Sequence, residues 1–301
     1  MSTALQPPAA RQGPGPIPQA LVDQLEPIVA RRVARSLPGE RRASGVGPGS
    51  ELAQIRPYQY GDDVRHIDPA ATARTGQPHV RLHVPERTLT TWLAIDVSPS
   101  MAFGSALRLK SDVAEGAAIV MGRLAVRRAG AVGAVLFGAG RAHVMPPRGS
   151  RPGLVALRRT LALGAAADGT RDPAALADAL VRLDRLARQP GLVVVISDFR
   201  DQREWTRALG TVRARHAVLA VEIADPREDE VPDVGRLAVV DPETGALLEV
   251  DTSHRGLRER FAAIEAERRA TLAGELRRLR VDHVRLRTDQ DWLQELGRVL
   301  R

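Results

Sequence analysis

The sequence predicts an α/β protein whose mostly parallel sheet is doubly wound, with helices covering both faces. Residues 92–95 and 192–196 form continuous apolar runs, which are typical of strands buried on both faces in a parallel sheet. Segments with helical periodicity separate such runs along most of the chain, and this alternation favours helical crossovers between parallel strands. In a sheet of this class, ligands bind beyond the carboxyl ends of the strands.

The N-terminal part of the chain is expected to contain little regular structure. Residues 1–20 are rich in Pro, Gly and Ala and predict a disordered tail. Residues 21–37 carry apolar side chains at helical spacing and predict one helix, which ends at Pro38-Gly39. The polar stretch of residues 44–74 lacks periodicity and is expected to be a structured loop, and residues 80–84 alternate like a strand. The expected division is a tail of residues 1–20, a helix with an Arg/Asp-rich segment at 21–87, and an α/β domain at 88–301.

In the α/β domain, strands are expected where apolar residues follow one another without interruption, and helices are expected where apolar residues recur every three to four positions. Thr244-Gly245 is typical of a tight turn and predicts a hairpin. The expected strands cover residues 88–97, 131–137, 142–144, 192–197, 217–223, 237–240, 246–250 and 281–286. The expected helices cover residues 105–128, 151–163, 173–187, 203–213 and 254–279, with a last helix from residue 290.

The composition excludes several classes of protein. The chain has no cysteine, which excludes disulfides, thiol nucleophiles and thiolate metal ligands and fits a cytoplasmic setting. It shows no signal-peptide-like stretch and no apolar run near the roughly 18 residues of a membrane span. The net charge of +8 raises the alternative of a basic nucleic-acid-binding protein. Arginines are spread among acidic residues and aromatics make up only 3%, so we expect no specific nucleic-acid partner.

Oxygen-bearing side chains follow the first strand of the predicted domain. Asp96, Ser98 and Ser100 alternate with Val97 and Pro99, so the three polar side chains can face one centre. Alone, such residues after a strand are more often turn and helix-cap residues than ligands. One carboxylate and two hydroxyls nevertheless suit a hard cation such as Mg²⁺, which takes oxygen ligands and keeps some waters.

Two further loops are expected near the same sheet edge. Asp168-Gly169-Thr170 precedes a predicted helix, and Ser197-Asp198 follows the most apolar strand of the chain. Thr170 adds a hydroxyl and Asp198 a second carboxylate. The coincidence of three loops favours a divalent-cation site over simple capping.

The pattern Asp-x-Ser-x-Ser, then Gly-Thr, then Ile-Ser-Asp resembles the metal-ion-dependent adhesion site (MIDAS) of von Willebrand factor A domains. The resemblance implies a Rossmann-type doubly wound fold over residues 88–301 and a cation that binds a partner's carboxylate. The implied metal residues are Asp96, Ser98, Ser100, Thr170 and Asp198, and the implied cation is Mg²⁺, or another divalent cation such as Mn²⁺ or Ca²⁺.

The segment at residues 52–75 resembles the signature of a bacterial family catalogued as domain of unknown function fifty-eight. Members of that family are commonly encoded beside MoxR-type AAA+ ATPases, so the resemblance implies an adaptor or chaperone-like partner of such an ATPase. The family usually has Trp where this chain has Pro69, and many members carry membrane helices. The signature residues are structural or partner-binding, and both interpretations stay open. They are Arg56, Tyr58, Gly61, Asp62, Asp63, Arg65, Asp68 and Arg74.

The resemblances imply a non-catalytic, metal-dependent protein-interaction module, and an enzyme is the alternative. An Asp after the first parallel strand is the place for the nucleophile of a Mg²⁺-dependent aspartyl phosphotransferase or phosphatase. Enzymes of the haloacid dehalogenase-like family usually have a second Asp two positions on, where this chain has Ser98. No lysine follows Lys110 to contact a phosphate, and no phosphate-binding Gly-rich loop with a Lys is present. We therefore expect no catalytic residues.

Overall fold

The computed structural model describes residues 12–36, 51–84, 89–127, 130–170, 175–201, 204–242 and 244–300. These residues divide into two compact units. The larger unit comprises residues 1–38 and 89–301, and the smaller comprises residues 39–88.

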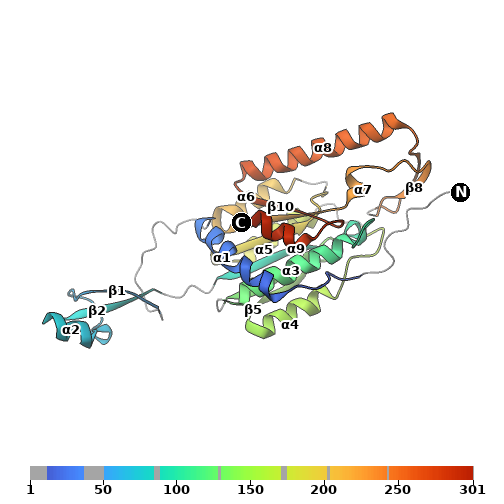
Figure 1. Ribbon diagram of the computed structural model, residues 1–301. Helices are drawn as coiled ribbons and strands as arrows, with labels where there is room; N and C mark the ends of the chain where they lie inside the picture. Colours follow the sequence, from blue (N-terminus) through green and yellow to red (C-terminus); the bar gives the residue numbers. More distant parts are fainter. Residues whose placement is uncertain are drawn as a thin grey trace. The chain divides into compact units, whose positions relative to one another are not determined.

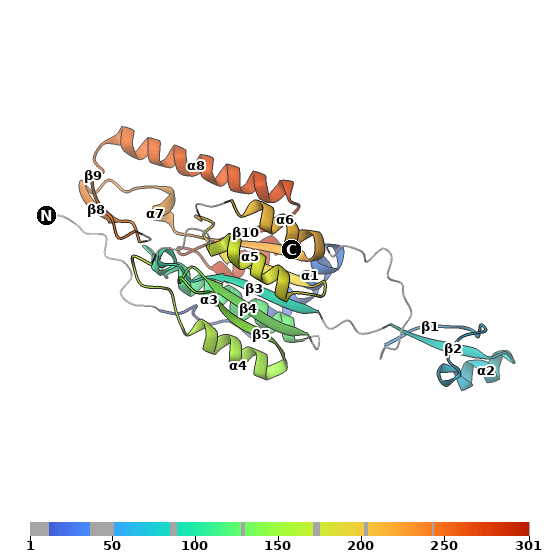
Figure 2. The same ribbon diagram turned by 180° about the vertical axis from the view of Figure 1, so that it is seen from behind.

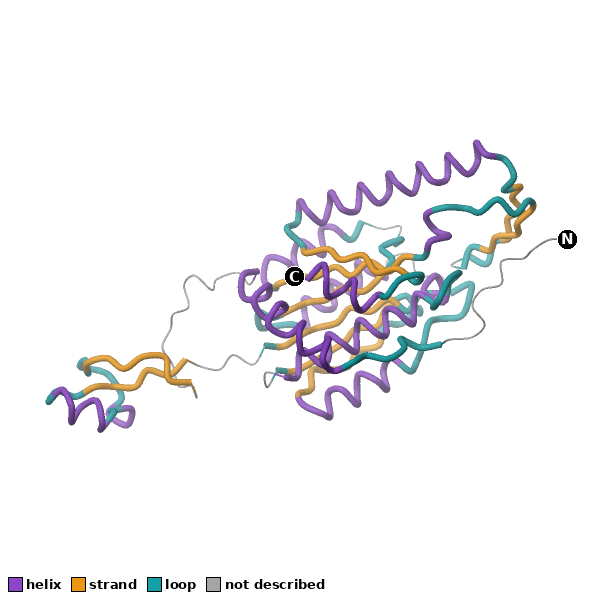
Figure 3. The backbone as a smooth tube through the Cα atoms, viewed as in Figure 1, coloured by secondary structure: helices purple, strands orange, loops and turns teal. Residues whose placement is uncertain are grey.

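A six-stranded sheet forms the centre of the larger unit (Figures 1 and 3). Five strands are parallel, and the edge strand β5 is antiparallel to β4. This arrangement confirms the predicted α/β class. In spatial order the strands are β10 (Asp282–Arg287), β7 (Ala217–Ala224), β6 (Leu192–Ser197), β3 (Thr90–Asp96), β4 (Ala131–Phe137) and β5 (His143–Gly149).

Helices cover both faces of this sheet because alternate residues of each buried strand point to opposite sides. Leu93 and Ile95 of β3 pack on one face, and Trp92 and Ala94 pack on the other. The first face carries α1 (Gln19–Ser36), α3 (Lys110–Arg127), α4 (Ser150–Leu161) and α9 (Trp292–Leu300). The second carries α5 (Ala175–Leu186), α6 (Thr206–Arg215) and α8 (Arg255–Arg278), as seen from behind in Figure 2.

Short elements complete the larger unit at the ends of its strands. A 3₁₀ turn, η2 (Pro99–Ala102), follows β3, and the four-residue helix α7 (Pro226–Asp229) follows β7. The predicted hairpin around residues 244–245 is formed by β8 (Arg236–Val240) and β9 (Leu247–Asp251). The helix expected from residue 105 begins only at Lys110, because η2 and a loop held by Asp225 precede it.

The N-terminal segment differs from the expected tail and domain division. Residues 1–11 lie outside the described residues, but the backbone N–H groups of Gln12 and Gly13 donate to the Asp112 carboxylate of α3. Helix α1 buries Val22 and Leu25 against the larger unit. The helix therefore belongs with the α/β domain, not with the Arg/Asp-rich segment that follows it in sequence, because its apolar stripe completes that core.

The smaller unit contains regular structure where the sequence predicted a loop. An antiparallel pair, β1 (Glu51–Pro57) and β2 (His79–Val84), flanks the 3₁₀ turn η1 (Val64–His66) and helix α2 (Pro69–Thr75). The expected strand at residues 80–84 is thus part of β2, whose partner in this unit is β1. The loop expectation was wrong because β1 alternates too weakly in hydrophobicity to show a strand period.

Candidate metal centre

The candidate site lies where the winding direction of the sheet reverses. From β3 the chain proceeds outward to β4 and β5, and it then returns to β6 on the other side of β3. Strands β3 and β6 are parallel neighbours, so the residues after Asp96 and Ser197 emerge at the same edge. Loops that diverge from two such strand ends leave a crevice, which is the usual ligand site of doubly wound sheets.

Four predicted site residues form a connected cluster of oxygen atoms at this point. The Ser98 backbone N–H donates to Asp96 Oδ1 at 2.9 Å, which turns the loop after β3 back toward the strand end. The hydroxyls of Ser98 and Ser100 share a hydrogen bond of 3.0 Å, and Ser100 Oγ donates to Asp198 Oδ2 at 2.9 Å. The two predicted loops therefore meet through their side chains. Ser197 Oγ, which was not predicted, donates to Asp96 Oδ2 at 2.6 Å.

The two carboxyl groups of the cluster have opposite electrostatic environments. Burial, together with the neighbouring Asp198 charge, raises the pKa of Asp96 to about 7, although hydrogen bonds from Ser197 and Ser98 lower it. Burial also opposes ionisation of Asp198, but the Lys110 ammonium outweighs it and holds the pKa of Asp198 at about 2. The cluster thus has one firmly ionised carboxylate and one that lacks a compensating positive charge.

Lys110 is a component of the site that sequence reasoning missed. It is the only lysine in the chain, and its side chain is fully buried. The ammonium group contacts Asp198 Oδ2 at 2.8 Å and Glu228 Oε1 at 2.6 Å. Burial lowers the pKa of Lys110, but the Asp198 and Glu228 charges more than offset this and raise it. The one sequence feature that could have drawn attention to Lys110 is that it is the only lysine in an arginine-rich chain.

Thr170 is not brought into hydrogen bonding with the other four predicted residues. Its hydroxyl donates to the Ala167 carbonyl oxygen at 2.8 Å, and no hydrogen bond to the oxygen cluster is found within the described part of the chain. The loop does approach the end of β3, because the Ala166 N–H donates to the Val97 carbonyl oxygen at 2.7 Å. Asp168 is exposed at the tip of this loop. Thr170 therefore lies in a loop that borders the cluster without joining it.

Two backbone features orient the cluster. Gly138 follows β4 with φ of +91°, and a Cβ at this position would lie 2.7 Å from Ser98 Cβ and 2.8 Å from Ser98 N. Phe199 has φ of +52°, a left-handed conformation that is unfavourable for a residue with a side chain. Packing of the buried Phe199 ring on Trp205, with centroids 5.5 Å apart, holds this turn beside Asp198.

The cluster is connected to helix α8 through Arg200. Its guanidinium group donates to both carboxylate oxygens of Glu265, at 3.2 and 2.9 Å, and lies 3.4 Å from Glu228. Its backbone N–H also donates to Asp198 Oδ1 at 3.1 Å. Asp198, Lys110, Glu228, Arg200 and Glu265 therefore form a continuous series of charged groups.

The signature residues of the smaller unit serve mainly to hold that unit together. Arg56 forms a bidentate pair with Asp62, at 2.9 and 2.8 Å, and this pair lowers the pKa of Asp62. Asp68 accepts from the Ala71 N–H, which caps α2, and from Arg81 at 2.7 Å.

The remaining signature residues lie at or near the surface of the smaller unit. Gly61 adopts φ of +103° in the turn before η1, and Tyr58 is half-buried with its N–H bonded to the Pro78 carbonyl oxygen. Asp63 and Arg65 form an exposed pair at 2.7 Å, and Arg74 is exposed.

The donor set of the oxygen cluster fits a hard divalent cation. Asp96, Ser98, Ser100 and Asp198 offer only oxygen atoms, which Mg²⁺ and Ca²⁺ prefer. The uncompensated Asp96 carboxyl lacks the positive charge that a cation would supply. No group of three or more carboxylate or imidazole side chains suited to a metal occurs in the described ranges, so a cation here would depend on hydroxyls and waters.

Together, the fold and the cluster define an α/β protein with a hydroxyl- and carboxylate-lined site at the switch point of a doubly wound sheet. The chain belongs to the family described as Protein of unknown function DUF58, whose model matches residues 54–271. It is 39% identical over 280 residues to the uncharacterized protein Rv1480 of Mycobacterium tuberculosis, covering 93% of this chain and 87% of the relative. It is also 39% identical over 158 residues to the uncharacterized protein MAV169 of Mycobacterium avium, covering 52% of this chain and 92% of the relative.

Solved structures with a related backbone include BatB from Bacteroides thetaiotaomicron, with a TM-score of 0.43 and 14% identity over 70% of this chain and 97% of BatB. They also include the VWA domain of SpRpn10, with a TM-score of 0.34 and 14% identity over 46% of this chain and 76% of that domain. Within the described residues, no helix combines the length and apolarity needed to cross a membrane.

Proposed function

We propose that this protein is a non-catalytic interaction module that binds a divalent cation at the oxygen cluster and a partner protein through it. The observation that carries the proposal is the meeting of Asp96, Ser98, Ser100 and Asp198 at the switch point, joined by hydrogen bonds of 2.9 to 3.0 Å. Mg²⁺ is the proposed ion, with Mn²⁺ and Ca²⁺ as alternatives. The sequence resemblance to von Willebrand factor A metal sites supports the same assignment.

Each residue has a distinct role in this proposal. Asp96 supplies the carboxylate that most needs a positive charge, and Ser98 and Ser100 supply hydroxyl oxygens. Asp198 stays ionised beside Lys110 and holds Ser100 in place. Thr170 would join the set through a movement of its loop. A bound cation with few protein charges around it would remain electrophilic and would accept a carboxylate from the partner.

The contacts of two side chains, Asp96 and Lys110, count against the alternative of an aspartyl phosphotransferase. Both Asp96 oxygens accept hydrogen bonds, from the Ser98 N–H and the Ser197 hydroxyl, which reduces the nucleophilicity of the carboxylate. Lys110 is fully buried and engaged by Asp198 and Glu228, so its ammonium is not presented to an incoming phosphate. The contacts of both side chains support a binding role.

The proposed partner is a MoxR-type AAA+ ATPase in the cytoplasm, for which the chain would act as an adaptor or chaperone-like subunit. This part of the proposal rests on the family to which the chain belongs and on the genomic association that the sequence resemblance implies. The exposed Asp63–Arg65 pair and Arg74 of the smaller unit are candidates for the ATPase contact.

Isothermal titration of the purified protein with Mg²⁺ and Mn²⁺ tests the cation site directly. Asp96→Ala should abolish binding, because it removes the carboxylate next to both serines. Asp178→Ala, at an exposed position on α5, is the matched control and should bind as the wild type does. Equal cation affinity in wild type and Asp96→Ala would refute the assignment.

Partner capture tests the interaction role separately. Tagged wild type and Asp96→Ala are incubated with lysate of the source organism, once in Mg²⁺ and once in EDTA, and retained proteins are identified by mass spectrometry. We expect an AAA+ ATPase or a client that is retained only by the wild type in Mg²⁺. Retention that ignores both the ion and the mutation would contradict cation-dependent binding.

A further inference from the structure

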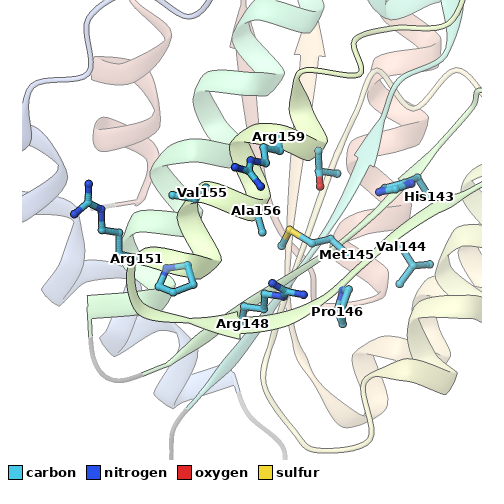
Figure 4. Close-up of a pocket in the computed structure, with 11 residues that line it drawn as sticks. His143, Val144, Met145, Pro146, Arg148, Arg151, Val155, Ala156 and Arg159 are labelled. Atoms are coloured by element: carbon cyan, nitrogen blue, oxygen red, sulfur yellow. The ribbon is translucent and has the colours of Figure 1, made fainter.

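A groove lies along the outer edge of the central sheet, between strand β5 and helix α4 (Figure 4). Its volume is about 590 Å³, within the range of small-ligand and peptide side-chain sites. It belongs to the larger unit, but β5 is separated from β3 by β4, so it is a different site from the oxygen cluster.

The rim of the groove is positively charged. Arg148, Arg151 and Arg159 line it with exposed side chains, and His143 lies at one end. No acidic residue is among the lining residues. Many other arginines of the larger unit are ion-paired, for example Arg215 with Asp184, whereas no ion pair within the described part of the chain involves the three rim arginines. Three cations with no ion-pair partner among the described residues make this a surface that attracts anions.

The floor of the groove is apolar. Met145 is buried at the base, and Ala156 is half-buried beside it. Val155 of α4 lines the groove with 42% of its surface exposed. In Figure 4, Met145 and Ala156 lie between Arg148 and Arg159. An occupant would therefore gain affinity from apolar contact in the centre and from charge at the sides.

The edge strand itself limits how an occupant can bind. Among the described residues, β5 is the edge strand of the sheet, and an edge strand would ordinarily invite another strand to pair with it. Pro146 and Pro147 interrupt it, and neither has a backbone N–H to donate. The pairing of β4 with β5 is also irregular here, with a bulge between Val132 and Ala134 of β4. Binding by continuous strand addition is therefore disfavoured, and recognition falls to the side chains of the groove.

We propose that this groove binds an acidic peptide segment of a partner protein, with an apolar side chain seated on Met145 and Ala156 and carboxylates at the rim arginines. Charge complementarity identifies the occupant, because all the formal charge in the lining is positive. A nucleic acid is disfavoured since the lining has no Phe, Tyr or Trp on which a base would stack. A membrane surface is disfavoured since the apolar floor is recessed and Met145 is 4% exposed.

Fluorescence anisotropy with a labelled peptide, in which a Leu-Leu-Phe core is flanked by glutamate runs, tests this proposal. The wild type should bind the peptide, and the double variant Arg148→Glu/Arg159→Glu should bind at least about tenfold more weakly, since two charge-assisted contacts become repulsive. Arg277→Glu/Arg278→Glu on α8 is the control with the same change in net charge, and it should change affinity less than about twofold. Val155→Ser should weaken binding without changing the charge.

Melting temperatures of the variants, which all carry changes at exposed positions, show whether the fold is retained. Absence of peptide binding, or equal losses in the groove and control variants, would overturn the proposal. Tighter binding of oligo-dT, or of vesicles containing phosphatidylglycerol, than of the peptide would overturn it in favour of that other ligand. A peptide with the same core and lysine flanks should not bind.

Discussion

At the scale of single residues, the neighbouring carboxyl groups of Asp96 and Asp198 are both buried, yet their pKa values are shifted in opposite directions. Both are nearly inaccessible to water, so desolvation disfavours the charged form of each. Asp198 has a buried ammonium 2.8 Å away, whereas Asp96 is surrounded by hydroxyl and amide donors and by the negative charge of Asp198. The Lys110 ammonium therefore compensates the charge of Asp198 but not that of Asp96. A second cation would stabilise the folded protein most beside Asp96.

This asymmetry predicts how stability depends on pH. The pKa of Asp96 is raised from 3.8 to about 7 in the folded protein. The protonated carboxyl group therefore contributes fully to the free energy of unfolding below pH 3.8, and this contribution is lost as the pH rises through about 7. Without metal, the melting temperature of the wild type should fall across this window relative to Asp96→Asn. At pH 8 the variant should be more stable by roughly 1–3 kcal/mol.

Differential scanning calorimetry of both proteins from pH 4 to pH 8, in EDTA and in Mn²⁺, measures this effect. Mn²⁺ should raise the melting temperature of the wild type more at pH 8 than at pH 5, because protons compete with the cation for Asp96. Parallel pH profiles for the two proteins in EDTA would show that Asp96 does not titrate in this range.

Lys110 is expected to be essential for stability because its buried ammonium lies between the buried Asp198 and the half-buried Glu228. Lys110→Met removes the cation from Asp198 and Glu228 and should lower the free energy of unfolding by about 3–5 kcal/mol. Adding Asp198→Asn to that variant should restore part of the loss, since the uncompensated charge is then removed. Urea denaturation followed by Trp fluorescence measures both. Strictly additive losses in the double variant would show that the two side chains are not coupled.

At the scale of elements, the site depends on backbone geometry at three strand ends. β3 and β6 supply the side chains, and the turn after β4 confines Ser98 through Gly138. The left-handed Phe199 directs the chain after β6 so that Asp198 reaches Ser100. The cluster is therefore a product of turn conformations as well as of residue identity.

Gly138→Ala tests this dependence. The added Cβ would meet Ser98 backbone atoms within 3 Å at a positive φ, so cation affinity should fall about tenfold or more and stability by about 1–3 kcal/mol. Gly140→Ala is the matched control, because Gly140 also has a positive φ of +76° but has open space where a Cβ would lie. Titration calorimetry with Mn²⁺ and urea denaturation measure the two effects. Equal cation affinity in both variants would show that Ser98 tolerates displacement.

Most of the central sheet could be predicted because its strands are apolar on both faces and its helices keep a clear period. The meeting of Asp96 and Asp198 followed from the rule that parallel strands place their carboxyl ends together. Lys110 could not be predicted, since only tertiary packing brings the start of α3 to Asp198. The extent of β5 was underestimated because Pro146 and Pro147 argue against a strand, and at a sheet edge that argument fails.

At the scale of the whole molecule, the N-terminal residues complete the α/β unit. Trp292 of α9 donates its indole N–H to the Pro14 carbonyl oxygen at 3.1 Å. Gln12 and Gly13 donate to Asp112. The chain thus passes over α3 and α9 before helix α1 begins. Residues 12–18, which sequence composition assigns to a tail, instead cover apolar surface of the domain, which Pro and Gly permit without regular structure.

Truncating the buried face of α1 should therefore destabilise the α/β unit as a whole. Leu25 is 3% exposed and packs in the same core as Leu293 and Leu296 of α9, so Leu25→Ala should cost about 2–4 kcal/mol. Gln24→Ala, on the exposed face of the same helix, should change stability by less than about 0.5 kcal/mol. Urea unfolding is followed both by Trp fluorescence and by far-UV circular dichroism. Coincident shifts in both signals would show that α1 unfolds with the sheet, and an unchanged midpoint in Leu25→Ala would show that α1 is an independent appendage.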